Sequence, residues 1–375
     1  MKNDNTKSEN SDMLTTSLDA LCHNSIELIR YARKYVTKQI NYTQLMTYYA
    51  LGYWIVEEQQ LGKTRAGYGK KVIQTLSDAL NTEFGKGFSA DTLENARKFY
   101  LNYQGRISET AFRKFIERKS DTLFRISDEI APFTLSWSHY LQLMRIKNLD
   151  ERRFYEIEAT KSAWSLRTLQ RQYNSSLYER LALSRNKDEV MRLAQEGNVI
   201  EKPADIVKQP TVLEFLGLEE KAKYSETDLE SAIIDKLQKF LLEMGKGYLF
   251  EARQKRFSYD EENFYVDLVF YNRLLRCYVL IDLKIDKLTH QDLGQMQMYV
   301  NYYDRCQKLP DENPTIGILL CREKNDAVVQ MTLPENSNIF ASEYNLYLPD
   351  KKMLQKKLQE WIDEETGGED DETTI

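Results

Sequence analysis

Two hydrophobic patterns divide this chain. From about Leu14 to Leu183, aromatic and aliphatic residues recur three or four positions apart, which is the period of an amphipathic helix. After Ser225 one more helical pattern runs to Gly245, and short runs rich in Val, Ile, Tyr and Phe follow, as is typical of strands. The sequence therefore predicts an all-α N-terminal half and an α/β C-terminal half.

The order of elements in the second half indicates its architecture. Three strand-like runs, YLFEARQKRFSY, NFYVDLVFY and RCYVLIDLKI, follow the first helix, and a helix then precedes the apolar run TIGILLC. A further strand near residues 340–348 and a closing helix at about 351–362 complete the series. This order predicts a mixed sheet flanked by helices.

Changes in composition place the expected domain boundaries. Between the two halves the chain becomes polar and contains Pro203 and Pro210, which indicates an interdomain connection that carries a short helical piece. The predicted segments are a disordered tail (1–13), a helical domain (14–185), a linker (186–224), the α/β domain (225–362) and an acidic disordered tail (363–375).

Composition narrows the class of protein. The apolar fraction of 42% and the charged fraction of 29% are typical of a soluble globular protein. The sequence has no run of about 18 apolar residues that would span a bilayer and no secretory signal, so we expect a cytoplasmic protein. The four cysteines are widely spaced, which favours reduced thiols over disulfides or a zinc site.

The net charge of -6 is unevenly distributed. Seven acidic and no basic residues follow residue 362, so the rest of the chain carries a net charge of +1. Between Arg97 and Arg125, eight basic residues stand against three acidic ones. This local excess suits a surface that faces phosphates, although a solvated helical face is the commoner explanation of such a run.

Two pairs of helices in the N-terminal half have the spacing of helix-turn-helix units. The first pair spans about Tyr68–Phe84 and, after the N-cap Ser89, continues to about Leu101. Its second helix would carry Asn95, Arg97 and Lys98 toward DNA. In the second candidate, Ser165 caps a helix on which Arg167 and Arg171 lie four residues apart. An ordinary helical bundle with solvated arginines is the alternative for both.

Three charged residues interrupt apolar strands in the C-terminal half. Asp267 lies within NFYVDLVFY, and Asp282 and Lys284 lie within YVLIDLKI. Alternation along a strand places Asp282 and Lys284 on the same face, and pairing of the two strands would bring Asp267 beside them. Two carboxylates this close favour a hard cation such as Mg²⁺ or Mn²⁺ between them. The alternative is a simple ion pair on an exposed edge, but charge buried in a central strand costs several kcal/mol and so implies a role.

Local sequence supports the first interpretation. The segments NFYVDLVFYNRLLRCYVLIDLKI, LGQMQMYVNYYD and NPTIGILLC, with RQKRF before them, resemble the nuclease domain of the bacterial YhcG-like family. That family belongs to the PD-(D/E)XK superfamily of nucleases. The resemblance covers about residues 227–344 and extends into the helical half at YWIVEEQQLGKTRAGYGKKVIQTLSDALNTEFGKGFSADTLENARKFYL.

The resemblance implies roles for individual residues. Asp267 takes the first acidic position of the motif, Asp282 the D/E position and Lys284 the lysine, while Val266 stands where the motif name has proline. Further expected participants are Glu230 as a helix-borne acid, Gln295 on the following helix, and the Leu283 carbonyl as a metal ligand. We expect Arg253 and Lys255 to contact DNA together with Arg97, Lys98, Arg167 and Arg171.

The resemblance implies an endonuclease that hydrolyses DNA with Mg²⁺ or Mn²⁺ and is brought to DNA by its helical half. The alternative is a catalytically silent protein that binds nucleic acid or regulates, using the nuclease fold as a platform. A homodimer is a further expectation, because many nucleases of this superfamily pair to cut both strands.

Overall fold

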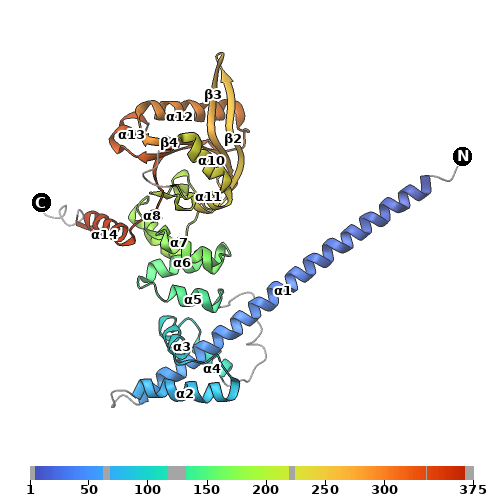
Figure 1. Cartoon of the computed structure of the whole chain (residues 1–375), viewed down its shortest axis with the longest axis vertical. Coiled ribbons are helices and arrows are strands. Elements are labelled where there is room, and N and C mark those ends of the chain that lie inside the picture. The colour runs from blue at the N-terminus through green and yellow to red at the C-terminus, as the bar shows by residue number, and fades with distance from the viewer. Residues whose placement is uncertain (1–4, 62–67, 117–131, 219–223, 335, 368–375) are drawn as a thin grey trace. The chain divides into compact units, whose positions relative to one another are not determined.

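The structure is a computed structural model that describes residues 5–61, 68–116, 132–218, 224–334 and 336–367. The chain forms two compact units, residues 1–147 and residues 148–375 (Figure 1). Among the described residues, the first unit is helical and the second combines helices with one sheet. No helix in the described ranges is both long enough and apolar enough to cross a bilayer.

The first unit is organised around one long helix. Its helices are α1 (Asn5–Leu61), α2 (Tyr68–Phe84), α3 (Ala90–Asn102), α4 (Glu109–Ile116) and α5 (Trp137–Leu143). Tyr49 of α1 lies at the centre of an aromatic cluster, with its ring centroid 5.0 Å from that of Tyr100 and 5.1 Å from that of Phe112. Gly52 lets α1 approach α3 closely, because a Cβ atom there would lie 2.2 Å from the Ala96 carbonyl oxygen.

The first predicted pair of helices is present at the expected positions. Helix α2 ends at Phe84, the chain turns through Gly85 at a φ of 79°, and α3 begins after Ser89. The Ser89 hydroxyl caps α3 by accepting a hydrogen bond from the backbone N–H of Thr92. A role of this pair in DNA binding stays a prediction.

The second unit begins with four helices and continues with the α/β elements. The helices are α6 (Leu149–Lys161), α7 (Leu166–Asn174), α8 (Leu177–Ala182) and α9 (Lys187–Glu196). The later elements are β1 (Thr211–Val212), α10 (Glu226–Asp235), α11 (Leu237–Met244), β2 (Tyr248–Tyr259), β3 (Glu262–Asn272), β4 (Cys277–Lys287), α12 (His290–Tyr302), β5 (Ile316–Glu323), α13 (Asp326–Thr332), β6 (Ile339–Asn345) and α14 (Lys351–Gly367).

One mixed sheet of six strands carries the α/β part. Its order is β1-β6-β5-β4-β3-β2. Strands β2, β3 and β4 pair antiparallel, whereas β4, β5, β6 and β1 pair parallel. The predicted mixed sheet flanked by helices is therefore confirmed.

Each face of the sheet is covered by different helices. Leu229 and Phe240, from α10 and α11, pack on one face together with Phe270 and Ile281. Met296 of α12 belongs to the cluster on the other face, with Leu280 and Val269 of β4 and β3. Strand β4 contributes buried residues to both clusters, so it is a central strand, and Asp282 in the middle of it is buried.

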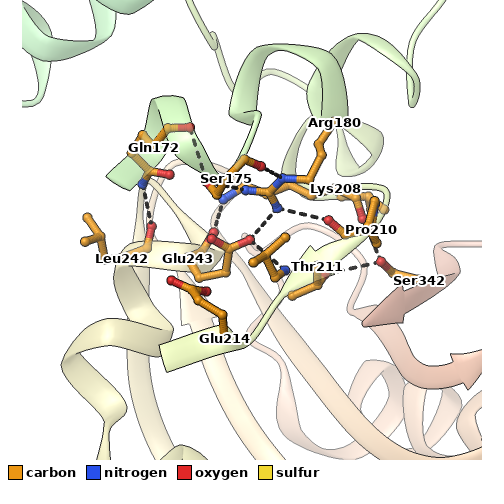
Figure 2. A network of polar contacts seen from close by, with 12 residues as sticks. Gln172, Ser175, Arg180, Lys208, Pro210, Thr211, Glu214, Leu242, Glu243 and Ser342 are labelled. Atoms are coloured by element: carbon orange, nitrogen blue, oxygen red, sulfur yellow. Dashed lines mark hydrogen bonds and ion pairs between the residues drawn. The ribbon is translucent and has the colours of Figure 1, made fainter. Parts of the chain in front are cut away.

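A buried ion pair joins the helices α7 and α8 to the α/β elements (Figure 2). The side chains of Arg180 and Glu243 are both fully buried, and Arg180 Nη1 lies 2.5 Å from Glu243 Oε1. Arg180 Nη1 also donates to the Pro210 carbonyl oxygen at 2.9 Å, and its Nε donates to the Ser175 carbonyl oxygen at 2.7 Å. Glu243 Oε1 accepts a second hydrogen bond from the backbone N–H of Val212 at 3.1 Å. The pair thus holds α8, α11 and β1 together.

Two further cations complete this network around Glu243. Arg171 of α7 lies 3.3 Å from Glu243 Oε2 and 3.1 Å from Glu214 Oε1. Lys208 donates to the backbone carbonyl oxygen of Glu243. Burial alone would raise the pKa of Glu243, but Arg180, Lys208 and Arg171 outweigh it and lower this pKa to about 2. Glu243 is therefore ionised in the folded protein at neutral pH.

The observed units can be compared with the segments expected from sequence. The division between units falls at Lys147 and Asn148, whereas composition placed the end of the helical domain at residue 185. The expected linker, 186–224, contains α9 and the edge strand β1, and α1 begins inside the expected N-terminal tail. Of the expected acidic tail, residues 363–367 belong to α14, and residues 368–375 lie outside the described residues.

Replacing Glu243 with Gln tests the buried network. The change leaves Arg180 without its counter-charge in a fully buried position, so we expect a loss of about 3–5 kcal/mol in the free energy of unfolding. Chemical denaturation of the full chain, followed by circular dichroism, measures this loss. Glu360→Gln on α14 is the matched control, because Glu360 is 57% exposed and pairs with Lys356 one helical turn away. Equal stability of the two variants would contradict the prediction.

Candidate nuclease site

Two neighbouring strands bring Asp267 and Asp282 together. The antiparallel register pairs Leu268 of β3 with Ile281 of β4, and the two aspartates occupy the next positions on these strands. Asp267 Oδ2 accepts a hydrogen bond of 2.8 Å from the backbone N–H of Leu283. The short turn between β3 and β4 sets this register. The number of residues between Asp267 and Asp282 therefore determines that they lie side by side.

Lys284 lies on the same face of β4 as Asp282. Its Nζ is 2.9 Å from Asp282 Oδ2, and 3.9 Å from both Glu226 Oε2 and Asp292 Oδ1. The ammonium group thus lies among three carboxylates. Asp282 is only 3% exposed. Its Oδ2 makes the ion-pair contact with Lys284, and no described residue donates a hydrogen bond of regular geometry to it.

Burial and like charge both act on Asp282. Burial raises the pKa of its carboxyl, the negative charge of Asp267 raises it further, and Lys284 offsets only part of this, so the pKa reaches about 7. Burial by itself would lower the pKa of Lys284, but Asp282, Glu226 and Asp267 outweigh it and raise this pKa. The site therefore holds a firmly protonated amine beside a carboxylate whose ionised form is disfavoured.

Glu230 joins the site through a residue that the sequence did not single out. Gln254 Nε2 donates to Glu230 Oε2 and, at 2.9 Å, to Asp267 Oδ1. Gln254 has a φ of 45°, a left-handed conformation that is uncommon for a residue with a side chain. Arg253 Nε binds the other oxygen of Glu230 at 2.7 Å. The only sequence signal for Gln254 was its place inside RQKRF.

Helix α12 supplies a tyrosine next to the carboxylates. Gln295, an expected site residue, is exposed and donates from its amide to the hydroxyl of Tyr299 one turn later. Tyr299 is 1% exposed, and burial, followed by the charge of Asp282, raises its pKa to about 12. Tyr299 and Glu226 were not anticipated from the sequence. Their spacing of four residues from Gln295 and Glu230 on the same helices is the sequence signal that would have identified them.

Glu230, the expected third metal-binding carboxylate, accepts hydrogen bonds from protein side chains. Glu230 binds Arg253 and Gln254, and Asp267 binds Gln254 and the Leu283 N–H. Within the described residues, no three His, Cys, Asp or Glu side chains form a cluster with metal-site geometry. Asp267 and Asp282 are thus the two acids that the fold itself places side by side.

The residues expected to bind DNA lie in different environments. Arg97 pairs with Glu94 at 2.6 Å, while Lys98 is 54% exposed. Arg167 and Lys255 are exposed. Arg253 is 42% exposed although it pairs with Glu230, whereas Arg171 is 18% exposed and bound to Glu214 and Glu243. The contacts of Arg171 inside the protein account for its position without DNA. Residues 117–131, which include Arg118, Lys119 and Arg125, lie outside the described residues.

Asp282→Asn tests the charge repulsion at this site. A folded-state pKa near 7, raised from 3.8, means that the contribution of Asp282 to stability is fully present below about pH 4 and is lost as the pH rises through about 7. Without divalent cations at pH 8, the variant should therefore melt at least about 2–4 °C higher than the original protein, the shift that about 1 kcal/mol produces in a domain of this size. This gain should shrink as the pH falls toward 4.

Thermal melts in a chelating buffer at several pH values measure this effect. Asp311→Asn serves as the control, because Asp311 is 69% exposed and pairs with an exposed arginine. A lower melting temperature for Asp282→Asn at pH 8 would refute the repulsion.

Comparison with solved structures gives partial likenesses. The chain resembles "crystal structure of a repair endonuclease from Pyrococcus abyssi", with 17% identity, a TM-score of 0.24, and 35% of this chain and 50% of that chain covered. It also resembles "Structure of EndoMS-dsDNA2 complex", with 14% identity, a TM-score of 0.25, and 36% and 50% covered. The alignments span half of each solved chain.

A sequence relative covers far more of the chain. The chain is 38% identical over 349 residues to "Putative nuclease YhcG" of Escherichia coli (strain K12), covering 89% of this chain and 91% of that protein. Residues 25–180 match the DUF1016 N-terminal domain, and residues 204–359 match the YhcG PDDEXK nuclease domain. The protein is therefore a member of the YhcG family of PDDEXK nucleases, as the motifs around Asp267, Asp282 and Lys284 predicted.

Proposed function

We propose that this protein is an endonuclease that hydrolyses phosphodiester bonds in DNA with the help of Mg²⁺ or Mn²⁺, and that its helical N-terminal half contacts the DNA. The observation that carries the proposal is the group formed by Asp267, Asp282 and Lys284 on two adjacent strands. An ordinary structural ion pair needs one acid and one base. This site keeps a second, like-charged acid beside the first at an energetic cost.

The donor set suits a hard divalent cation. A buried oxygen of Asp282 contacts Lys284 Nζ at 2.9 Å but makes no regular hydrogen bond, and burial together with the charge of Asp267 raises the pKa of this carboxyl. A cation between the two carboxylates would remove this repulsion, and carboxylate oxygens are the ligands that Mg²⁺ and Mn²⁺ prefer. Asp267 and Asp282 would hold the ion, with the Leu283 carbonyl as an additional oxygen and Glu230 as a further acid close by.

The residues of the chain would then divide the chemistry. A bound divalent ion supplies Lewis acidity, which polarises a phosphodiester oxygen and makes a neighbouring water more acidic. Lys284, held protonated by its carboxylate neighbours, stabilises the negative charge that develops at the phosphorus. Gln254 orients Glu230 and Asp267, and the buried strand β4 excludes bulk water behind the site.

Cleavage assays on single-residue variants test this proposal. Lys284→Met should lower the rate of cleavage at least about 10²-fold, as removal of one charge-stabilising donor does in other enzymes. Asp282→Asn should abolish cleavage. The substrates are labelled single-stranded, duplex and branched DNA, with RNA counterparts, and either Mg²⁺ or Mn²⁺. Lys287→Met is the matched control, because Lys287 lies on the same strand but is 55% exposed and pairs with Glu323.

Each outcome of the assay has a meaning. Cleavage by the original protein and the control, and not by the site variants, supports the nuclease. Equal cleavage by all four proteins means that the activity does not come from this site. No cleavage by any of them, together with DNA retention and no Mn²⁺ binding in calorimetry, favours the catalytically silent DNA-binding protein.

DNA contact by the helical elements has its own test. If Lys98 and Arg167 contact phosphates, replacing each with Ala should weaken DNA binding and reduce the slope of log K against log salt by about one. Lys352→Ala is the control, an exposed lysine of α14 outside the expected DNA-binding set. Fluorescence anisotropy with a labelled duplex over a salt series measures both quantities. Unchanged slopes for Lys98→Ala and Arg167→Ala would exclude these two contacts.

A further inference from the structure

The N-terminal part of α1 exposes an apolar surface. From Tyr42 onward the helix is buried in the first unit through Tyr42, Leu45, Met46 and Tyr49. Before Tyr42, large apolar side chains are 42–68% exposed, namely Leu21, Ile26, Leu28, Ile29, Tyr31, Tyr35, Val36 and Ile40. So many exposed apolar residues within about five helical turns mark an interaction surface. We call residues 19–40 the α1 extension.

The exposed residues continue the buried face of the same helix. Leu21, Leu28 and Tyr35 are seven residues apart, and the same interval leads on to the buried Tyr42 and Tyr49. A seven-residue interval keeps side chains nearly in line along a helix, as in a coiled coil. The apolar band of the extension thus runs directly into a face that is used for helix packing.

A groove continues the other side of the band. Ile40 lines a cavity of about 430 Å³ in the first unit, together with Thr43, Thr47, Tyr48 and Phe88. The extension therefore leads on one side to packed helices and on the other to an open groove. A second helix laid along the extension would meet apolar side chains over its whole length.

The order of charges selects the occupant and its direction. Within the extension the acidic residues, Asp19 and Glu27, precede all of the basic residues, Arg30, Arg33, Lys34 and Lys38. A parallel copy would place the four basic residues beside their counterparts. An antiparallel copy places acidic residues beside basic ones on both sides of the centre, and charges that flank an apolar seam set helix orientation in this way.

We propose that the α1 extension is a dimerisation surface that pairs antiparallel with the same segment of a second copy of this chain, crossing near Leu28 and Ile29. Such an interface is two-fold symmetric. If one residue of the first copy contacts a second residue of the other copy, the same contact also occurs with the two copies exchanged. The pairing buries the apolar band, which a single copy leaves in water. This inference concerns the first unit alone and does not depend on the proposed nuclease activity.

The oligomeric state of the full chain tests the proposal. Sedimentation equilibrium over a range of concentrations should give a dimer for the original protein. The double variant Leu28→Glu with Ile29→Glu places four acidic groups at the centre of the dimer, so we expect its dissociation constant to rise at least about 100-fold. His23→Glu is the control, because His23 is exposed and lies on the side of the helix away from the band. Circular dichroism shows whether each variant keeps its helices.

Cross-linking tests the direction of pairing. Cys22 is exposed, and in an antiparallel pair it lies near residue 36 of the second copy, whereas in a parallel pair it lies near the other Cys22. With the exposed Cys306 changed to Ser in every sample, a short bis-maleimide should link chains that carry Cys22 and Val36→Cys together. It should not link chains that carry Cys22 alone, or Val36→Cys with Cys22→Ser. Within one helix these positions are about 21 Å apart, beyond the reach of the reagent.

Three results would overturn the proposal. One is a monomer at every concentration. Another is efficient linking through Cys22 alone, which would indicate a parallel pair. A third is a monomer that sediments with anionic lipid vesicles and loses this binding in the Leu28→Glu, Ile29→Glu variant, which would assign the surface to a membrane.

Discussion

The repulsion between two carboxylates on adjacent strands is the constraint around which the candidate site is built. Asp267 and Asp282 occupy neighbouring positions on β3 and β4, and Asp282 is buried because β4 is a central strand. Each of the surrounding contacts offsets part of this cost. Lys284 supplies a positive charge, Gln254 and the Leu283 N–H supply hydrogen bonds, and Arg253 neutralises Glu230. If these positions served the fold alone, apolar residues in place of the charged ones would make the protein more stable.

The main features of this site were readable from the sequence because they follow from local periodicity. Charged residues stood out in apolar strands, alternation put Asp282 and Lys284 on one face, and a short turn fixed the pairing of β3 with β4. The bridging role of Gln254 was not readable. It depends on a left-handed backbone conformation within β2, for which neither glycine nor asparagine gives a cue.

Long-range contacts explain the rest of what the sequence missed. Arg171 has the helical spacing and charge of a DNA-contacting residue, but its partners Glu214 and Glu243 lie 43 and 72 residues later in the chain. Strand β1 has only two residues and follows a proline, so it has no periodicity to detect. The polar, proline-interrupted composition of residues 186–224 led us to expect a connection with a short helical piece, yet the same composition also fits the edge strand β1.

The Arg180–Glu243 pair also has a consequence for how this family can change. Its two halves lie on either side of residue 204, where the match to the nuclease domain begins. Exchange of the preceding segment between relatives would therefore transplant one buried charge without the other, unless both positions are the same in donor and recipient. A junction at residue 204 would also divide the ion pairs of Arg171 with Glu214 and Glu243 and of Lys246 with Glu158, whereas a junction before residue 148 keeps all of these pairs on one side.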